Sequence, residues 1–366
     1  MKTGLNMRSV KNENRSSVLY LLQKNGSMSR KEIAERLGLT PAAVTKICND
    51  LISCGILKET GEISKGGKGR KEILLSLNFG EKYVLGINAE TTHITYSLSK
   101  LSGEVLSVTT SPFTDNIDAV LEKAEELLYD NFIDNKRIFS AGICVVGSVS
   151  GKGYGLWNCQ ELCNKISSKY SVPVTAENNV RAFAQSEMLY SGGYGNESVL
   201  FFKWGPGIGS AIWADGKILS GNDKGIAEIG HYIVNPAGKK CRCGRYGCLE
   251  TEAGEEALVA LTNLPLKEII TSQSEDVINI LDEKIDIVAL ALTNTATILN
   301  AKKIVLFGSV FSNETVVEKL KRQCIRYNGN LTADMIITAK LNEKIGYAGP
   351  AAICAKKFFF ELQDSN

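Results

Sequence analysis

Residues 228–250 read EIGHYIVNPAGKKCRCGRYGCLE and hold one imidazole and three thiols within a short span. These four side chains are His231, Cys241, Cys243 and Cys248. Together they match the tetrahedral donor set that Zn²⁺ takes in structural sites, with no coordination position left open. Gly244 and Gly247 permit the tight turn that lets the sulfur atoms converge. The stretch therefore predicts a structural zinc loop that holds one ion per chain, and the alternative is a loop of reduced cysteines.

The overall composition is that of a folded protein without a membrane segment. Of the 366 residues, 44% are hydrophobic and 22% are charged, which excludes general disorder. The longest apolar candidate, residues 138–149, is too short to span a bilayer. The N-terminus lacks the apolar stretch of a secretory signal. We therefore expect a cytoplasmic protein whose other cysteines stay reduced, most of them as small buried hydrophobic residues.

The formal net charge of +2 conceals an uneven distribution along the chain. Residues 1–78 hold 14 Lys and Arg against 7 Asp and Glu, whereas the remainder holds 28 against 33. A basic N-terminal fifth on an acidic body is typical of an appended nucleic-acid-binding module. The alternative is a basic tail that is merely solvated, and the helical pattern of this segment argues against it.

The basic segment carries signals for three short helices. The first predicted helix ends near Gly26, a C-terminal cap signal. Ser29 and Glu32 have the spacing of a capping box that opens a second helix. Thr40 caps a third helix, with Pro41 in its first turn. The last two helices predict a helix-turn-helix, whose second helix can enter the major groove of DNA.

A predicted β-hairpin follows the three helices. Its strands, residues 56–59 and 73–77, flank a tip rich in Lys and Gly at residues 64–71. Glycines let such a wing approach a groove closely, and its cations can neutralise phosphates. The pattern predicts DNA binding, and the alternative is a protein-interaction module. The candidate DNA contacts are Arg30, Thr40, Ala42, Ala43, Thr45, Lys46, Asn49, Lys65, Lys68, Arg70 and Lys71.

The rest of the chain alternates strands and helices in two sets. Three strands between residues 83 and 108 predict a meander, and a buried strand follows at 140–146. A second set of strands runs from 199 to 212, and a long helix is predicted over 285–299. Two such sets imply a two-lobed α/β protein with a cleft between the lobes. We expect a DNA-binding domain at 1–80, a first lobe at 81–198 with a final helix at 347–366 packed back on it, and a second lobe at 199–346.

Residues 228–231 and the cysteine loop together resemble the signature of the ROK family, named for repressors, open reading frames and kinases. The winged-helix head is similar to that of the repressor branch, which includes xylose and N-acetylglucosamine repressors. The resemblance covers essentially the whole chain. It implies that the body has the actin-like fold of sugar kinases and hexokinase-type ATPases.

The same resemblance implies a sugar site built from amide, carboxylate and imidazole groups. The residues that match sugar-binding positions of the family are Asn158, Asn178, Asn179, Glu228, His231 and Glu250. His231 would serve both metal and sugar, with one ring nitrogen for each. Asparagine is also a common helix cap, and Asn178 has that alternative.

Four matched positions depart from the kinases of the family. Asn179 replaces the Asp that acts as general base, and an amide cannot accept the proton. Glu90 lies in the first phosphate loop, where a carboxylate adds bulk and repels phosphate. Pro206 removes a backbone donor from the second loop, and Ser309 replaces a glycine on the adenosine side. These departures predict a sugar receptor without enzymatic activity, and the competing hypothesis is a sugar kinase with a DNA-binding head.

Taken together, these features predict a sugar-responsive transcriptional repressor of carbohydrate-utilisation genes. Its expected partners are a double-stranded DNA operator, a monosaccharide and further copies of the chain, as a homodimer or a dimer of dimers. The apolar face of residues 290–299 is a candidate dimer interface, and a buried core helix is the alternative. Relief of repression by the sugar is expected, with activation as the alternative sign.

Overall fold

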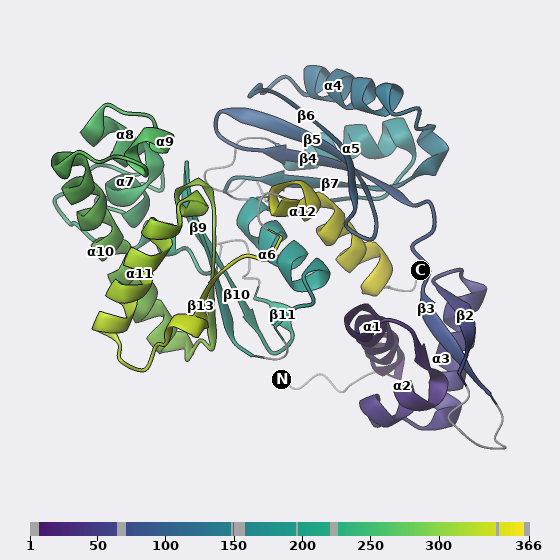
Figure 1. Ribbon diagram of the computed structural model, residues 1–366. Coiled ribbons are helices and arrows are strands. Elements are labelled where there is room, and N and C mark those ends of the chain that lie inside the picture. Colours follow the sequence, from purple (N-terminus) through teal and green to yellow (C-terminus); the bar gives the residue numbers. More distant parts are fainter. Residues whose placement is uncertain are drawn as a thin grey trace.

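The computed structural model describes residues 7–63, 71–147, 149, 158–194, 197–219, 226–341 and 344–361. A small N-terminal head lies beside a body of two α/β lobes, each with a five-stranded sheet (Figure 1). The predicted DNA contacts Lys65, Lys68 and Arg70 fall outside the described residues. Within the described ranges, every helix is too short or too polar to cross a bilayer.

The head contains three helices and a first short strand. They are α1 (Met7–Asn25), β1 (Met28–Ser29), α2 (Arg30–Leu37) and α3 (Pro41–Ser53). The predicted capping box is confirmed, because the Ser29 hydroxyl accepts from the Glu32 amide while the Glu32 carboxylate accepts from the Ser29 amide. Thr40 caps α3 by accepting from the amide of Ala43. The helix-turn-helix thus forms from local signals.

The predicted wing is also confirmed. Strands β2 (Leu57–Ile63) and β3 (Glu72–Leu77) pair antiparallel, and β1 joins the other edge of β3. Leu75 of β3 is fully buried, together with Val44 and Leu51 of α3. The hairpin therefore shares one core with the helices, and the head is a winged helix-turn-helix.

The first lobe is a mixed sheet with the order β6-β5-β4-β7-β8. Its strands are β4 (Tyr83–Ala89), β5 (His93–Lys100), β6 (Val105–Pro112), β7 (Ile138–Val145) and β8 (Val174–Asn178). The predicted meander of the first three strands is antiparallel, whereas β4, β7 and β8 run parallel. Helices α4 (Ile117–Asp130) and α5 (Cys159–Tyr170) cover one face and bury apolar side chains against it.

Helix α12 (Lys344–Ala355) packs on the opposite face of the first sheet, against β4 and β7 (Figure 1). The approach is close because two strand positions lack side chains. A Cβ on Gly142 would overlap the backbone of Pro350, and one on Gly86 would press on the Pro350 ring. The chain then continues as a π-helical turn, Lys356–Phe360. The described helical segment thus spans Lys344–Phe360, and residues 362–366 of the expected range 347–366 lie outside the described residues.

The second lobe has the strand order β11-β10-β9-β12-β13. Its strands are β9 (Val199–Trp204), β10 (Ile208–Ala214), β11 (Lys217–Ile218), β12 (Lys303–Phe307) and β13 (Ile336–Thr338). Its helices are α7 (Leu249–Ala253), α8 (Glu255–Thr262), α9 (Leu266–Ile269), α10 (Glu275–Leu299) and α11 (Glu314–Tyr327). Short 3-10 helices of this lobe lie at Ile229–His231, Ser309–Ser312 and Ala333–Met335, and one of the first lobe lies at Asn135–Arg137.

The long helix α10 begins well before the predicted start at residue 285. In its first turns Val277 and Leu281 face the core at helical spacing with Ile285, so the sequence carried a signal for the earlier start. Helices α7 to α9, of five, eight and four residues, are too short to show a long apolar repeat. The segment of α10 that was predicted as either core or interface is partly buried and partly exposed. Leu292 and Ala296 are buried, whereas Ile298 is exposed.

Helix α6 (Asn179–Tyr190) lies between the two sheets. It packs against α12 of the first lobe and β10 of the second, and Phe183 and Ala184 belong to a core cluster with Phe201 and Val305. Ten of its twelve residues are buried. Because α6 contacts both lobes, its position depends on the angle between them.

The head is joined to the body by a shared apolar core. The Tyr20 ring of α1 stacks on Phe360 with ring centroids 4.8 Å apart, and Phe79 packs on Phe359. The Ser16 hydroxyl donates a hydrogen bond of 2.8 Å to the Phe360 carbonyl. The residues that follow α12 therefore fix α1 against the first lobe.

Candidate functional site

A cavity of about 520 Å³ lies between the two lobes. Its walls bring together residues far apart in the sequence, including Asn179 at the start of α6 and Glu90 after β4. The second lobe contributes Glu228, His231 and Glu250. A cavity of this size with a few convergent polar groups suits a small polar molecule.

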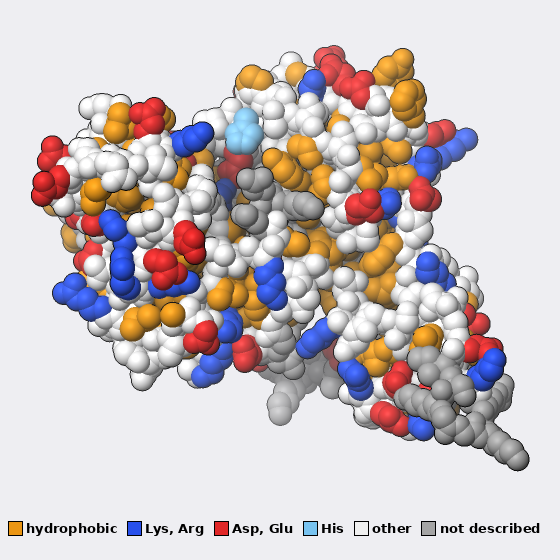
Figure 2. Space-filling model, in the orientation of Figure 1, with side chains coloured by type: hydrophobic (Ala, Val, Ile, Leu, Met, Phe, Trp, Pro, Cys, Tyr) orange, Lys and Arg blue, Asp and Glu red, His pale blue; other side chains and the backbone are white. Residues whose placement is uncertain are grey.

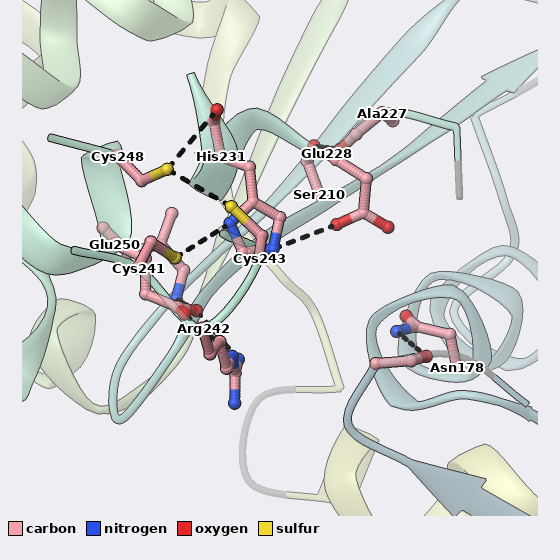
Figure 3. Close-up of polar contacts among 12 residues, drawn as sticks. Asn178, Ser210, Ala227, Glu228, His231, Cys241, Arg242, Cys243, Cys248 and Glu250 are labelled. Atoms are coloured by element: carbon pink, nitrogen blue, oxygen red, sulfur yellow. Dashed lines mark hydrogen bonds and ion pairs between the residues drawn. The ribbon is translucent and has the colours of Figure 1, made fainter. Parts of the chain in front are cut away.

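Four side chains at one edge of this cavity form a metal-ligand cluster (Figure 3). They are His231, Cys241, Cys243 and Cys248, and their donor atoms all lie within 4.8 Å of one another. Cys241 Sγ is 3.5 Å from His231 Nδ1, and Cys243 Sγ is 3.6 Å from Cys248 Sγ. A tetrahedral ion with ordinary Zn–S and Zn–N bond lengths requires separations of about 3.8 Å between sulfurs and about 3.6 Å between sulfur and nitrogen. The cluster could therefore hold a metal ion.

The loop reaches this geometry through two isolated bridges and one obligatory glycine. Ile233 pairs with Cys248, and Lys240 pairs with Tyr246, so the loop closes on itself. Gly247 has a φ of 64°, and a Cβ there would overlap the carbonyl oxygen of Asn235. The predicted role of this glycine in bringing the cysteines together thus has a steric basis.

The imidazole of His231 stands between the cluster and the cavity. Its Nδ1 faces Cys241, and its Nε2 lies 4.0 Å from a carboxylate oxygen of Glu228 (Figure 3). Burial, together with the nearby cations Arg242 and Arg245, lowers the pKa of His231 to about 4. The ring is therefore neutral at pH 7, which is the form that ligates a metal.

Glu250 is a second buried acid of the cavity wall. One carboxylate oxygen accepts a hydrogen bond of 3.1 Å from the amide of Ile208, and the other pairs with Arg242 at 3.1 Å. Burial raises the pKa of Glu250, although Arg242 and the Ile208 amide act against the rise. These contacts hold the side chain in one orientation at the turn between β9 and β10.

Asn179 is 2% exposed and lies at the opposite wall of the cavity. Its Nδ2 donates a hydrogen bond of 3.0 Å to Oε1 of Glu90. Lys203 of β9 completes the group, with Nζ at 2.9 Å and 3.1 Å from the two Glu90 oxygens. Lys203 was not predicted as a site residue, although a single lysine within the apolar strand sequence VLFFKW is a usable signal.

A second cavity, of about 710 Å³, lies on the other side of this ion pair. Its lining includes Asn88, Phe307 and Ser309, and Glu90 and Lys203 line both cavities. The buried pair therefore stands between them. Burial alone would raise the pKa of Glu90, but the Lys203 ammonium and the hydrogen bonds from Lys203 and Asn179 lower it overall.

The two remaining asparagines of the predicted sugar set act as helix caps. Asn178 Oδ1 accepts from the amides of Val180 and Arg181, and its Nδ2 donates to the Gly147 carbonyl (Figure 3). Asn178 also lines the first cavity. Asn158 is exposed at the start of α5, where it caps the helix, and the structure does not bring it to the described cavity wall.

Four of the predicted DNA contacts lie along one face of α3. Ala42, Thr45, Lys46 and Asn49 are exposed along α3 and line a shallow groove. Thr40 is exposed at the start of the helix, and Ala43 is half-buried.

Two of the predicted cations pair with acidic groups of the head. Arg30 donates to Asn49 Oδ1 and Glu59 Oε1, at 3.2 Å and 3.3 Å, which ties α2 to α3 and the wing. Lys71 pairs with Glu62 across the hairpin at 3.0 Å. On the body, too, basic and acidic side chains are interspersed over the face shown in Figure 2.

The chain is similar to curated transcriptional regulators over most of its length. It is 27% identical over 351 residues to the DNA-binding transcriptional dual regulator NagC of Escherichia coli K12, covering 87% of this chain and 86% of that protein. It is 26% identical over 338 residues to the xylose repressor of Bacillus subtilis 168, covering 84% and 85%.

Solved structures share the same fold. A ROK family transcriptional regulator, described as a homologue of the Escherichia coli Mlc protein, aligns with a TM-score of 0.78 at 24% identity over 96% of this chain and 98% of that one. A ROK family glucokinase from Streptomyces griseus, solved with glucose and AMPPNP, has a TM-score of 0.64 at 22% identity, covering 75% and 99%.

The family matches divide the chain as the fold does. Residues 11–58 match the winged helix-turn-helix DNA-binding family, and residues 84–357 match the ROK family. The second match covers most of the chain and includes the cavity, the metal-ligand cluster and the final helix. The predicted fold class is thus confirmed, and the chain belongs to the ROK family, with a winged helix-turn-helix head.

Proposed function

We propose that this protein is a sugar-responsive DNA-binding repressor of carbohydrate-utilisation genes, in which the ROK body senses the sugar. One observation carries the proposal. Helix α6 starts at Asn179 in the wall of the cavity and ends beside the head, where the Leu189 carbonyl accepts a hydrogen bond from Gln23 of α1. A ligand that changes the position of α6 therefore acts on both the cavity and the head.

The cavity has the polarity that a monosaccharide requires. Glu228, Glu250 and Asn179 offer acceptor oxygens, and neighbouring hydroxyl groups of a sugar can donate to them. Asn178 contributes as the cap that orients the start of α6. Asn158 is retained in the proposed sugar set on the family resemblance. The names of the related repressors, for N-acetylglucosamine and xylose, support a monosaccharide as the effector.

We assign zinc to the metal-ligand cluster, because three thiolates and one imidazole are the donors that structural Zn²⁺ prefers. When bound, the ion supplies a fixed point that holds the loop together. His231 then has its Nδ1 committed to the metal, and its Nε2 stays directed toward Glu228 and the cavity. The loop thereby orients one wall of the sugar site.

The body has lost the means of phosphoryl transfer in this proposal. Asn179 cannot act as a general base, since an amide does not take a proton at neutral pH. The buried Glu90–Lys203 pair lies between the two cavities, where a transferred phosphoryl group would have to pass. Glu90 also places negative charge beside that path. Sugar binding without phosphorylation follows from these features.

The head would bind a DNA operator through α3 and the wing. Ala42, Thr45, Lys46 and Asn49, exposed on α3, would meet base edges, and the predicted cations of the wing would meet phosphates. A homodimer, or a dimer of dimers, would present two heads to the half-sites of a pseudo-palindrome. Ile298, 80% exposed on α10, is a candidate for the contact between copies. Operator binding would place the protein in the cytoplasm.

The proposal is tested by selecting duplexes from a random DNA library with the purified full chain, followed by fluorescence anisotropy on the enriched site. We expect a palindromic site, and we expect the affinity of the protein for this site to fall at least fivefold when D-xylose, D-glucose or N-acetylglucosamine is added. Failure to enrich any duplex would contradict the proposal. So would ADP release at ordinary enzymatic rates with ATP, Mg²⁺ and the same sugars, if Asn179→Ala abolishes it.

A further inference from the structure

Two of the departures from the kinase pattern are direct neighbours in the structure. Glu90 replaces a glycine of the first phosphate loop, and Asn179 replaces the catalytic Asp, yet 89 positions separate them in the chain. Their side chains are joined by the hydrogen bond from Asn179 Nδ2 to Glu90 Oε1. The two substitutions therefore have to be considered as one change.

Glu90 determines which end of the Asn179 amide faces the cavity. An ionised carboxylate can only accept hydrogen bonds, so the NH₂ group of Asn179 must point toward Glu90. The carbonyl oxygen Oδ1 is then the part of the amide offered to a ligand. Lys203 holds the carboxylate in this place from the second lobe with two hydrogen bonds. All three residues are less than one-tenth exposed, so these contacts are largely shielded from water.

The charge count of the group explains why the two positions depend on each other. The three side chains carry one negative and one positive charge, which is neutral as a unit. An Asp at position 179 would bring a second carboxylate within hydrogen-bond distance of Glu90, and two adjacent buried carboxylates cannot both ionise readily. A Gln at position 90 could instead donate to that Asp and still accept from Lys203.

We propose that Glu90 and Lys203 are positioning residues that fix the Asn179 amide with its carbonyl oxygen toward the ligand, so that Asn179 accepts a hydrogen bond from a sugar hydroxyl. This inference rests on the proposed sugar-binding function. The single carboxylate of the group stands at position 90 rather than 179. The site thus keeps an acceptor oxygen for the sugar while lacking a base.

The test transfers the single carboxylate from position 90 to position 179 by a pair of isosteric substitutions in the full chain. Asn179→Asp alone should lower the thermal unfolding temperature and weaken sugar binding at least tenfold. Glu90→Gln alone should also weaken binding, since a Gln at this position no longer fixes the amide. The double variant N179D/E90Q should recover at least tenfold in sugar affinity relative to N179D, and should regain most of the lost thermal stability.

Affinity is measured by calorimetry with whichever of D-xylose, D-glucose or N-acetylglucosamine raises the unfolding temperature of the wild-type protein. The matched control is Asn116→Asp, an exposed cap of α4 where the same chemical change should combine additively with Glu90→Gln. If N179D fails to fold and the double variant folds, the coupling is demonstrated by stability alone. Additive effects at positions 90 and 179, or a double variant no better than N179D, would overturn the inference.

The outcomes separate this inference from the proposed function. If none of the three sugars binds the wild-type protein, the proposed monosaccharide function is contradicted, whereas the stability cycle still tests the contact between Glu90 and Asn179. If the wild type binds a sugar and N179D binds it equally well, only the positioning role is wrong.

Discussion

The side-chain amide of Gln23 donates a hydrogen bond of 3.0 Å to the main-chain carbonyl of Leu189, and this contact joins the head to the helix that begins in the cavity. Leu189 lies in the last turn of α6, and Asn179 is its first residue. A rigid, buried helix transmits displacement from one end to the other, because its backbone hydrogen bonds resist compression. This contact thus connects the cavity wall directly to the head.

Removing that connection should weaken the response rather than either binding event. In the variant Gln23→Ala, we expect operator affinity without sugar to change little, and the sugar-induced loss of affinity to fall severalfold. Anisotropy titrations with and without the sugar measure both quantities. Gln160→Ala is the matched control, since Gln160 is exposed on α5 and bonds only within its helix. An unchanged sugar response in Gln23→Ala would contradict the role of this contact.

The metal-ligand cluster should be required for the stability of the second lobe. We expect about one zinc per chain by elemental analysis, and loss of the ion with a chelator should lower the unfolding temperature, because metal binding contributes directly to folding. Cys243→Ser should lower the zinc content, and it should lower the free energy of unfolding by several kcal/mol. Cys54→Ser, which removes an exposed thiol in the head, serves as the control and should change neither.

Two glycines of the loop should differ sharply when replaced by alanine. Gly247→Ala should abolish metal binding and destabilise the protein, because the added Cβ overlaps the Asn235 carbonyl oxygen. Gly244→Ala has open space around its Cβ, with a φ of 90°, so it should cost only about 1–2 kcal/mol of backbone strain. Zinc content and chemical denaturation compare the two. Equal losses would show that crowding at Gly247 is not decisive.

The pH dependence of stability should contain a contribution from Glu90. Its pKa is lower in the folded protein than the ordinary 4.5, so the ionised form stabilises the fold above that pH. The contribution is lost as pH falls through the lowered pKa. Glu90→Gln should therefore cost about 3 kcal/mol near pH 7, and the difference from wild type should shrink below pH 4.5. Denaturant titrations from about pH 2 to pH 7 provide the comparison.

A lysine on α3 should contribute to DNA binding through its positive charge. Lys46 is exposed on α3, and Lys46→Ala should weaken operator binding and reduce the slope of log affinity against log salt by about 1. Lys302→Ala, an exposed lysine of the body, should leave the slope unchanged. A slope that is the same in wild type and Lys46→Ala would exclude a phosphate contact for this lysine.

Local signals were sufficient for most of the elements. The Ser29–Glu32 capping box and the Thr40 cap could be predicted, because a cap depends on residues within one turn. The start of α10 was predicted too late, although Val277 and Leu281 already lie at helical spacing on its buried face. Asn178 had two predicted roles, and the structure shows the cap.

The sequence by itself determined the chemistry of this protein: one histidine and three cysteines in one loop, a basic winged head, and an amide at position 179. These properties depend only on residue type and on short spacings, both of which can be read from the sequence. Only the tertiary structure decided that Glu90, Asn179 and Lys203 meet in one buried group and that α6 reaches from the cavity to Gln23. These contacts join residues 89 to 166 positions apart, and they arise from the packing of two sheets around one helix, which local sequence does not encode.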